Sequence, residues 1–115
     1  MLLKDIIRLV QGTSLTGDLH AEKEISLEYT TSMMSSVLVL SRFDALMVTD
    51  LCGILVVRTA LMSDIPDILI TDGHQPTAAM IALAKASAIS LATTAMDLSS
   101  VTDLLSKNGV NSLYH

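Results

Sequence analysis

Short apolar runs of this chain end in threonine three times, at Thr49, Thr71 and Thr94. Each run is followed by a stretch with helix-like spacing, and this order is typical of βα units on a largely parallel sheet. Such a sheet brings the carboxyl ends of its strands to one edge, where open α/β folds bind their ligands. The three hydroxyls are therefore candidates to line one crevice. An equally good interpretation is that each hydroxyl satisfies backbone at a strand end or caps the next helix.

The turn from Thr71 to Pro76 is the strongest candidate for ligand contact. Gly73 permits a positive φ, and Pro76 suits the first turn of a helix whose free backbone donors and dipole favour an anionic group. Asp72 disfavours a phosphate at that place, but its carboxylate can accept a hydrogen bond from a ribose hydroxyl. The alternative is a tight turn that only reverses the chain, as turn residues more often do. The predicted site comprises Thr49, Asp50, Thr71, Asp72, Gly73, His74, Pro76 and Thr94.

The other chemistry-bearing residues indicate neither catalysis nor a metal site. His20, His74 and His115 lie in separate segments without metal-ligand spacing. Nucleophile-elbow, dinucleotide-binding, Walker-type and zinc-protease motifs are all absent from the sequence. Cys52, the single cysteine, cannot form an intramolecular disulfide, and its apolar surroundings favour a core residue over an activated thiolate. We therefore expect no enzymatic activity, no metal and no cofactor.

Composition sets further limits on partners. The chain has 115 residues, which suits one domain, and a net charge of −5, which repels nucleic acids and anionic membrane surfaces. Half of the residues are hydrophobic, more than a domain of this size buries alone, so we expect a homodimer. Charged residues interrupt the apolar region 37–62, and the amino terminus does not resemble a signal peptide. These features predict a cytoplasmic protein with no membrane span.

Apolar periodicity predicts a single three-layer α/β domain over residues 1–115, with a mainly parallel sheet of four or five strands and helices on both faces. Beyond the βα rhythm we expect no sequence repeat. The expected strands are 14–16, 25–30, 45–49, 67–71 and 90–92, with 110–115 as a further strand or a frayed tail. The expected helices are 3–10 with a left-handed cap at Gly12, 33–40, 51–62, 76–87, and one from about Asp97 that stops at Gly109.

The segment 51–62 is apolar on all sides except at Arg58 and Thr59, so we expect the sheet and a second surface to cover it. Asp50 or Thr49 is the expected cap of this helix. Arg58 is a candidate to bind a ligand carboxylate or phosphate, or to pair with an acidic residue. The expected dimer interface includes this helix or the one at 33–40.

Five segments occur in an order that resembles a known family. They are 31–37, 56–60, 68–76, 88–94, and Leu105 with Gly109. Together they resemble the DRTGG domain family, and the layout is similar to the amino-terminal domain of bacterial HPr kinase/phosphorylase. The resemblance implies an α/β domain, usually dimeric, that occurs alone, beside nucleotide-binding CBS domains or attached to enzymes. Kinase activity does not carry over, because the phosphate-binding loop of that enzyme belongs to a part not represented here.

The chain also departs from the family pattern. Ser32 and Ser36 replace acidic residues of the family's helix motif, and Leu27 with Glu28 replaces its glycine pair. The resemblance thus implies a non-catalytic regulatory or accessory domain, which as a homodimer has a crevice for a small nucleotide-like ligand. The alternative is a protein-interaction adaptor for an operon-encoded enzyme, for example a hydrogenase-associated complex, with no small ligand.

Overall fold

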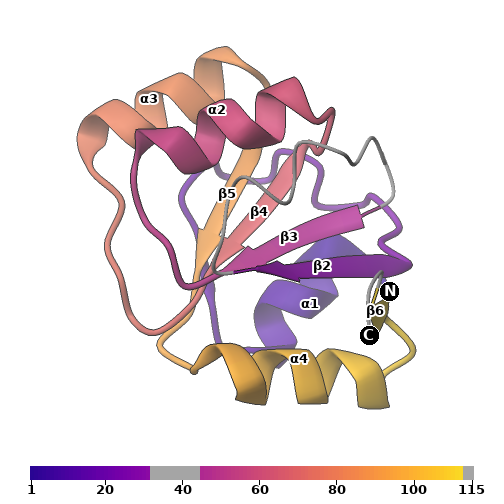
Figure 1. Cartoon of the computed structure of the whole chain (residues 1–115). Coiled ribbons are helices and arrows are strands. Elements are labelled where there is room, and N and C mark those ends of the chain that lie inside the picture. The colour runs from indigo at the N-terminus through magenta and orange to yellow at the C-terminus, as the bar shows by residue number, and fades with distance from the viewer. Residues whose placement is uncertain (32–44, 113–115) are drawn as a thin grey trace.

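The computed structural model describes residues 1–31 and 45–112, and the helix expected at 33–40 lies outside them. The described residues form four helices and six strands (Figure 1). The helices are α1 (Leu3–Leu9), α2 (Ile54–Met62), α3 (Ala78–Ala86) and α4 (Leu98–Lys107). The strands are β1 (Thr13–Ser14), β2 (Leu27–Thr31), β3 (Ala45–Thr49), β4 (Asp67–Ile70), β5 (Ser90–Thr93) and β6 (Asn111–Ser112).

All six strands of the described residues join one sheet in the order β1-β5-β4-β3-β2-β6. Every neighbouring pair is parallel except β1 with β5. The predicted parallel sheet is confirmed, and the two-residue strands at its edges extend it beyond the four or five strands expected. None of the helices in residues 1–31 and 45–112 has the length and apolar character needed to cross a membrane.

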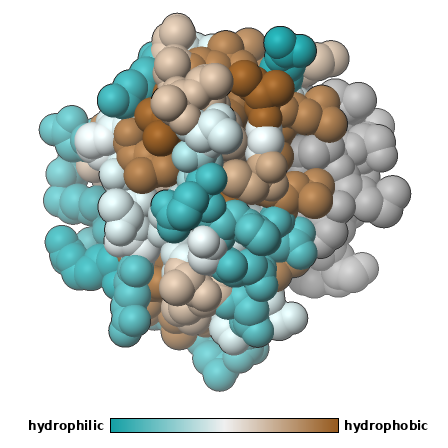
Figure 2. Space-filling view, turned by 90° about the vertical axis from the view of Figure 1, so that its left-hand side faces the viewer, coloured by the Kyte–Doolittle hydropathy of each residue, from teal (hydrophilic) through white to brown (hydrophobic). Residues whose placement is uncertain are grey.

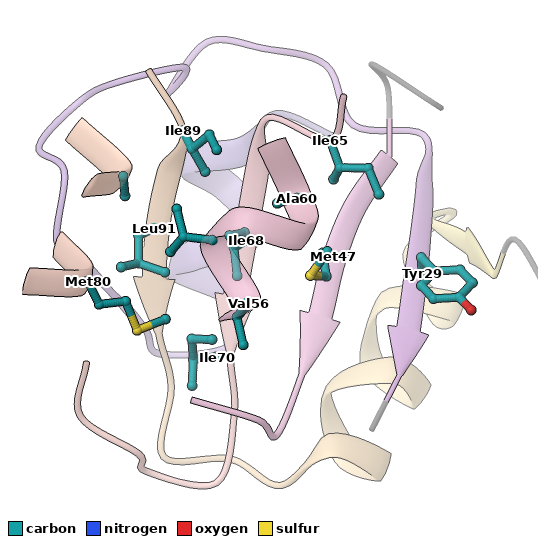
Figure 3. Packing of buried hydrophobic residues seen from close by; sticks show 12 residues of the cluster. Tyr29, Met47, Val56, Ala60, Ile65, Ile68, Ile70, Met80, Ile89 and Leu91 are labelled. Carbon is teal, nitrogen blue, oxygen red and sulfur yellow. The ribbon is translucent and has the colours of Figure 1, made fainter. Parts of the chain in front are cut away.

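Alternate residues of the central strands divide the core into two layers, as the period of a strand requires. On one face, Ile68 and Ile70 of β4 pack in the cluster that α2 and α3 cover (Figure 3). On the other face, Leu69 packs in the cluster that α1 and α4 cover. This arrangement is the expected three-layer α/β fold, and Figure 1 shows a helix pair on each side of the sheet.

The alternation in β2 differs from the expected pattern of one wet face. Ser26, just before the strand, is exposed as predicted, but Glu28 is buried and accepts a hydrogen bond from the Thr30 hydroxyl. Helix α4 packs on this strand, and β6 pairs with it at Leu27 and Glu28, so Glu28 is closed to solvent while Thr30 is half-buried. The sequence pattern could not show this, because α4 and β6 lie more than 60 residues further along the chain.

The described helices all end in a Schellman motif, in which a backbone N–H beyond the helix donates to a carbonyl of its last turn. The donor and acceptor pairs are Gly12 to Ile7, Ile65 to Ala60, Ile89 to Ala84 and Val110 to Leu105. The residue before each donor has a left-handed conformation, and these residues are Gln11, Asp64, Ala88 and Gly109.

The predicted stop at Gly109 is confirmed, whereas the left-handed cap predicted at Gly12 is wrong because Gln11 adopts that conformation. Gly12 has a different requirement. A Cβ atom at this position would lie 2.7 Å from the carbonyl oxygen of Thr93, so a larger residue would push α1 away from β5. The glycine thus permits a close approach between two backbones.

Two consecutive helix ends also share a sequence pattern, Ala-x-x-Ser-x-Ile, at residues 60–65 and 84–89. This short pattern belongs to the predicted βα rhythm. In both segments the isoleucine N–H donates to the alanine oxygen over 2.9 Å, and both isoleucines enter the same core layer. The two α-to-β connections are copies of one local structure.

The helix starts differ in part from the predicted ones. Thr77 caps α3 by accepting a hydrogen bond from Met80 N over 3.2 Å, so Pro76 precedes the cap and is not the first helical residue. Helix α4 begins at about Asp97 as predicted, with Asp97 as its cap, and hydrogen bonds from the side chain and backbone of Ser100 lower the pKa of the Asp97 carboxyl. Helix α2 begins after Gly53 without a side-chain cap, so neither Thr49 nor Asp50 caps it.

Replacing Ala88 by glycine should stabilise the domain, because a left-handed alanine costs about 1 kcal/mol that glycine avoids. We expect the midpoint of thermal unfolding to rise by about 4 °C for a domain of this size. Ala82→Gly is the matched control: this exposed residue lies inside α3, where glycine costs about 1 kcal/mol, so the midpoint should fall. A fall in both variants would contradict the left-handed conformation of Ala88.

Candidate functional site

The three threonines predicted to share an edge do lie at the carboxyl ends of neighbouring strands. Strands β3, β4 and β5 are adjacent and parallel. Thr49 is the last residue of β3, and Thr71 and Thr94 directly follow β4 and β5; all three are fully or almost fully buried. The N–H of Thr71 donates to Thr49 O, and the N–H of Thr94 donates to Ile70 O, both over 2.9 Å. This edge is the place where the loops leading to α2, α3 and α4 gather in Figure 1.

The threonine hydroxyls are occupied within the protein. Thr49 Oγ1 accepts from Leu51 N over 3.1 Å, and Thr71 Oγ1 donates to Asp72 Oδ2 over 2.6 Å. Thr94 Oγ1 donates to the buried Val10 O over 2.6 Å and accepts from a backbone N–H two residues later. The geometry favours the interpretation in which these hydroxyls satisfy backbone at strand ends. Their contact with a ligand stays a prediction.

The turn after β4 is fixed by backbone hydrogen bonds to the loop between β5 and α4. Asp72 and Gly73 both have positive φ, at 65° and 73°, which confirms the conformation predicted for the glycine. Asp72 N donates to Met96 O over 2.8 Å, and Gly73 N donates to Thr94 O over 3.0 Å. These two backbone donors are therefore not available to a ligand. The turn is instead a rigid support.

The side chains of this turn are the accessible part of the edge. Asp72 and His74 are exposed, and Pro76 is half-buried before the cap of α3. Asp50 is half-buried after β3. Hydrogen bonds thus link Thr71 with Thr49 and Asp72, and Gly73 with Thr94. His74, Pro76 and Asp50 lie on the segments that leave the same edge.

Three helices begin at this edge, so their partially positive amino ends point toward it. Thr77 and Asp97 cap α3 and α4, but no side chain among residues 1–31 and 45–112 caps α2. The first N–H groups of α2, at Ile54 and Leu55, have no partner inside the helix. Asp72 follows the neighbouring strand β4, so this edge offers helix-start donors and, on a separate segment, a carboxylate that can accept from hydroxyl groups.

Two other candidates have different surroundings from those expected. Cys52 is exposed and not a core residue, because α2 begins three residues later than predicted and the cysteine stays in the preceding loop. Partial desolvation raises the pKa of its thiol, which disfavours an activated thiolate. Arg58 is on the exposed side of α2. In the residues described, no group of three histidine, cysteine or acidic side chains is arranged to hold a metal ion.

A polar cluster at the opposite, amino edge of the sheet was missed in the sequence. Asp67, the first residue of β4, is fully buried, and its carboxylate accepts hydrogen bonds from Ser90 Oγ over 2.6 Å and from Lys23 Nζ over 2.7 Å. His20 Nδ1 lies 2.9 Å from the same carboxylate. The available signal was an acidic residue at the head of an otherwise apolar strand.

No family model matches the sequence, and no curated protein matches it significantly. One similar solved structure is a crystal structure of the CBS and DRTGG domains of the regulatory region of Clostridium perfringens pyrophosphatase, complexed with its activator, diadenosine tetraphosphate. The sequences are 16% identical, and the TM-score is 0.69. The match covers 90% of this chain and 45% of that chain, so this chain spans less than half of the other.

At this identity the likeness shows the fold alone. It confirms the α/β architecture and supports a DRTGG-like fold without showing membership of that family. The similar structure belongs to a regulatory region and not to a catalytic domain.

Replacing Thr94 by valine should destabilise the domain by about 1 to 3 kcal/mol, because the buried Val10 carbonyl loses its hydrogen-bond donor. Thr102→Val is the matched control: its hydroxyl makes an exposed hydrogen bond to Ser99 O, and its removal should change stability by less than about 0.5 kcal/mol. Urea unfolding curves measure both values. Equal stabilities for the two variants would show that the Thr94 hydroxyl has no structural role.

Proposed function

We propose that this chain is a non-catalytic regulatory domain that binds a small nucleotide-like ligand at the carboxyl edge of its sheet and acts as a homodimer. The observation that carries the proposal is the position of the uncapped start of α2 at the same edge as the rigid turn 71–76. Backbone N–H groups at helix starts bind phosphate groups, and a fixed turn lowers the entropy lost on binding.

The exposed side chains of the turn suit the remainder of a nucleotide. The Asp72 carboxylate has one oxygen bonded to the Thr71 hydroxyl, and it can accept a further hydrogen bond from a ribose hydroxyl. The exposed imidazole of His74 offers a planar surface to a base. Asp72 and the start of α2 belong to different segments, so they can contact the sugar and the phosphate separately.

The bonding of the edge supports a role without catalysis. A hydroxyl nucleophile needs a neighbouring base within hydrogen-bond reach and a free path to its substrate. The Thr49 and Thr94 hydroxyls are buried and bonded to backbone. Thr71 is also buried, and its proton is directed to Asp72 in the same turn. These side chains are suited to hold the edge rigid.

The comparison adds support from the fold. The similar structure is described as a regulatory region bound to a nucleotide activator, which makes that activator a reasonable first probe for this chain. Nothing in the comparison supports the alternative role as an adaptor for an enzyme.

The homodimer is proposed from the exposed side of α2. Leu55 and Met62 are 62% and 72% exposed, and Ile54 and Leu61 are also exposed. Figure 2 shows hydrophobic surface concentrated in the upper half of the molecule, the side on which α2 and α3 lie in Figure 1. Contiguous apolar surface of this kind is typical of an interface.

Diadenosine tetraphosphate should raise the midpoint of thermal unfolding, because a ligand at about 100 times its dissociation constant stabilises the folded state by about 2.7 kcal/mol. His74→Ala should reduce this shift and leave the unliganded midpoint unchanged, since the side chain is exposed. Lys85→Ala is the control for general attraction of a polyanion, because Lys85 is exposed at the far end of α3 and should not alter the shift. If adenine mono- and dinucleotides produce no shift, the ligand part of the proposal is wrong.

The wild-type chain should have the mass of a dimer in light scattering at micromolar concentration. Leu55→Asp combined with Met62→Asp should give a monomer, because two carboxylates would have to lose water in an apolar interface. Ser99→Asp, on the exposed side of α4, is the control and should remain dimeric. A stable wild-type monomer would exclude the homodimer.

A further inference from the structure

We propose that the amino edge of the sheet holds a second binding site, for a small protonated amine with an apolar body. The site is a cavity of about 310 Å³ between the ends of α2 and α3 and the starts of β4 and β5. Its apolar wall includes Leu61, Ile65, Pro66 and Ile89. Its polar lining consists of His20, Asp64 and Ser87. The volume is within the range of small-molecule sites.

The buried carboxylate of Asp67 fixes the orientation and the tautomer of His20. Lys23 Nζ and Ser90 Oγ both donate to this carboxylate, so it acts as the acceptor toward His20 Nδ1 as well. A neutral imidazole that donates through Nδ1 keeps a lone pair on Nε2. His20 lines the cavity and is only about a quarter exposed, so in the neutral form we propose Nε2 as the acceptor for an N–H group of the ligand.

His20 is also held in an uncommon backbone conformation. Its φ is 58°, in the left-handed region that few residues other than glycine adopt. The loop around it is tied to the sheet by Lys23 and by Thr16, whose hydroxyl accepts from Leu91 N over 3.1 Å. Contacts on both sides of the histidine thus hold this conformation and, with it, the position of the imidazole.

The electrostatics of the cavity favour a cation. The carboxyl ends of α2 and α3 lie beside it, and each carries a partial negative charge. Lys23 offsets the charge of Asp67, while Asp64 adds a carboxylate to the lining. A ligand with one ammonium group and a hydrocarbon or aromatic body would satisfy the histidine, the negative field and the apolar wall together. This site does not depend on the proposed nucleotide site, which lies at the opposite edge.

Benzylamine and benzoate test the proposal, because they share a ring and differ in the sign of their charge. We expect benzylamine to shift the backbone amide resonances of Leu61, Ser87, Ala88 and Ile89 in ¹H–¹⁵N spectra, with a dissociation constant on the order of 1 mM. Benzoate should leave these resonances unchanged. Equal binding of both compounds, or no shift of these amides at millimolar benzylamine, would overturn the proposal. Shifts confined to residues 72–78 would also overturn it, whatever they imply for the carboxyl edge.

Two variants separate binding from folding. His20→Asn suits a left-handed position and can still donate to Asp67, but it lacks the second ring nitrogen, so benzylamine binding should weaken about tenfold. Asp64→Asn, also compatible with a left-handed backbone, should weaken it about threefold by removing a charge. Asp18→Asn, exposed in the same loop as His20, is the control and should bind normally. Normal binding by a folded His20→Asn protein would exclude the histidine from the site, and normal binding by Asp64→Asn would contradict the cation preference.

Discussion

The strands at the centre of this sheet are buried on both faces, so the backbone groups at their ends must be satisfied without water. At the carboxyl edge this is done mainly by threonines. Backbone bonds join Thr71 to Thr49 and Gly73 to Thr94, and the Thr94 hydroxyl reaches back to Val10 at the end of α1. The edge is held in one arrangement because each of these segments is hydrogen-bonded to its neighbour. What remains accessible there is the set of helix starts and the side chains of Asp72 and His74.

At the amino edge, a buried carboxylate joins neighbouring segments through side-chain hydrogen bonds. Asp67 opens β4 in the core, and its carboxylate collects donors from the adjacent strand and from the loop around His20 and Lys23. A buried carboxylate is costly unless it is paired, so this loop is held where the donors are needed. The helices α2, α3 and α4 start near the carboxyl edge, whereas α1 ends there, with the Val10 carbonyl bonded to the Thr94 hydroxyl. The ends of α2 and α3 lie at the amino edge, and their partial negative charge supports the cation proposed there.

Most of the fold could be predicted because it depends on local patterns. Apolar runs of four or five residues located β3, β4 and β5, and the glycine at 109 located the end of α4. The errors arose at positions where a contact between distant segments determines the local structure. Gly12 is required because the backbone of Thr93 approaches closely, and Glu28 is buried because α4 packs on β2. The amino-edge cluster could not be found in this way, because His20 and Asp67 are 47 residues apart and neither belongs to a motif.

Helix α2 connects the proposed functions physically. Its start lies at the carboxyl edge, its last turn contributes Ala60 and Leu61 to the cavity wall, and its outer side carries the exposed Leu55 and Met62. A nine-residue helix is about 14 Å long, so α2 extends from the side of the carboxyl edge to the cavity at the amino edge. A regulatory ligand must favour one of two arrangements that another molecule can distinguish. Among the described residues, α2 packs on the sheet and on α3 through the side that carries Val56, Val57 and Ala60, so both proposed ligands and a second subunit would contact this one helix.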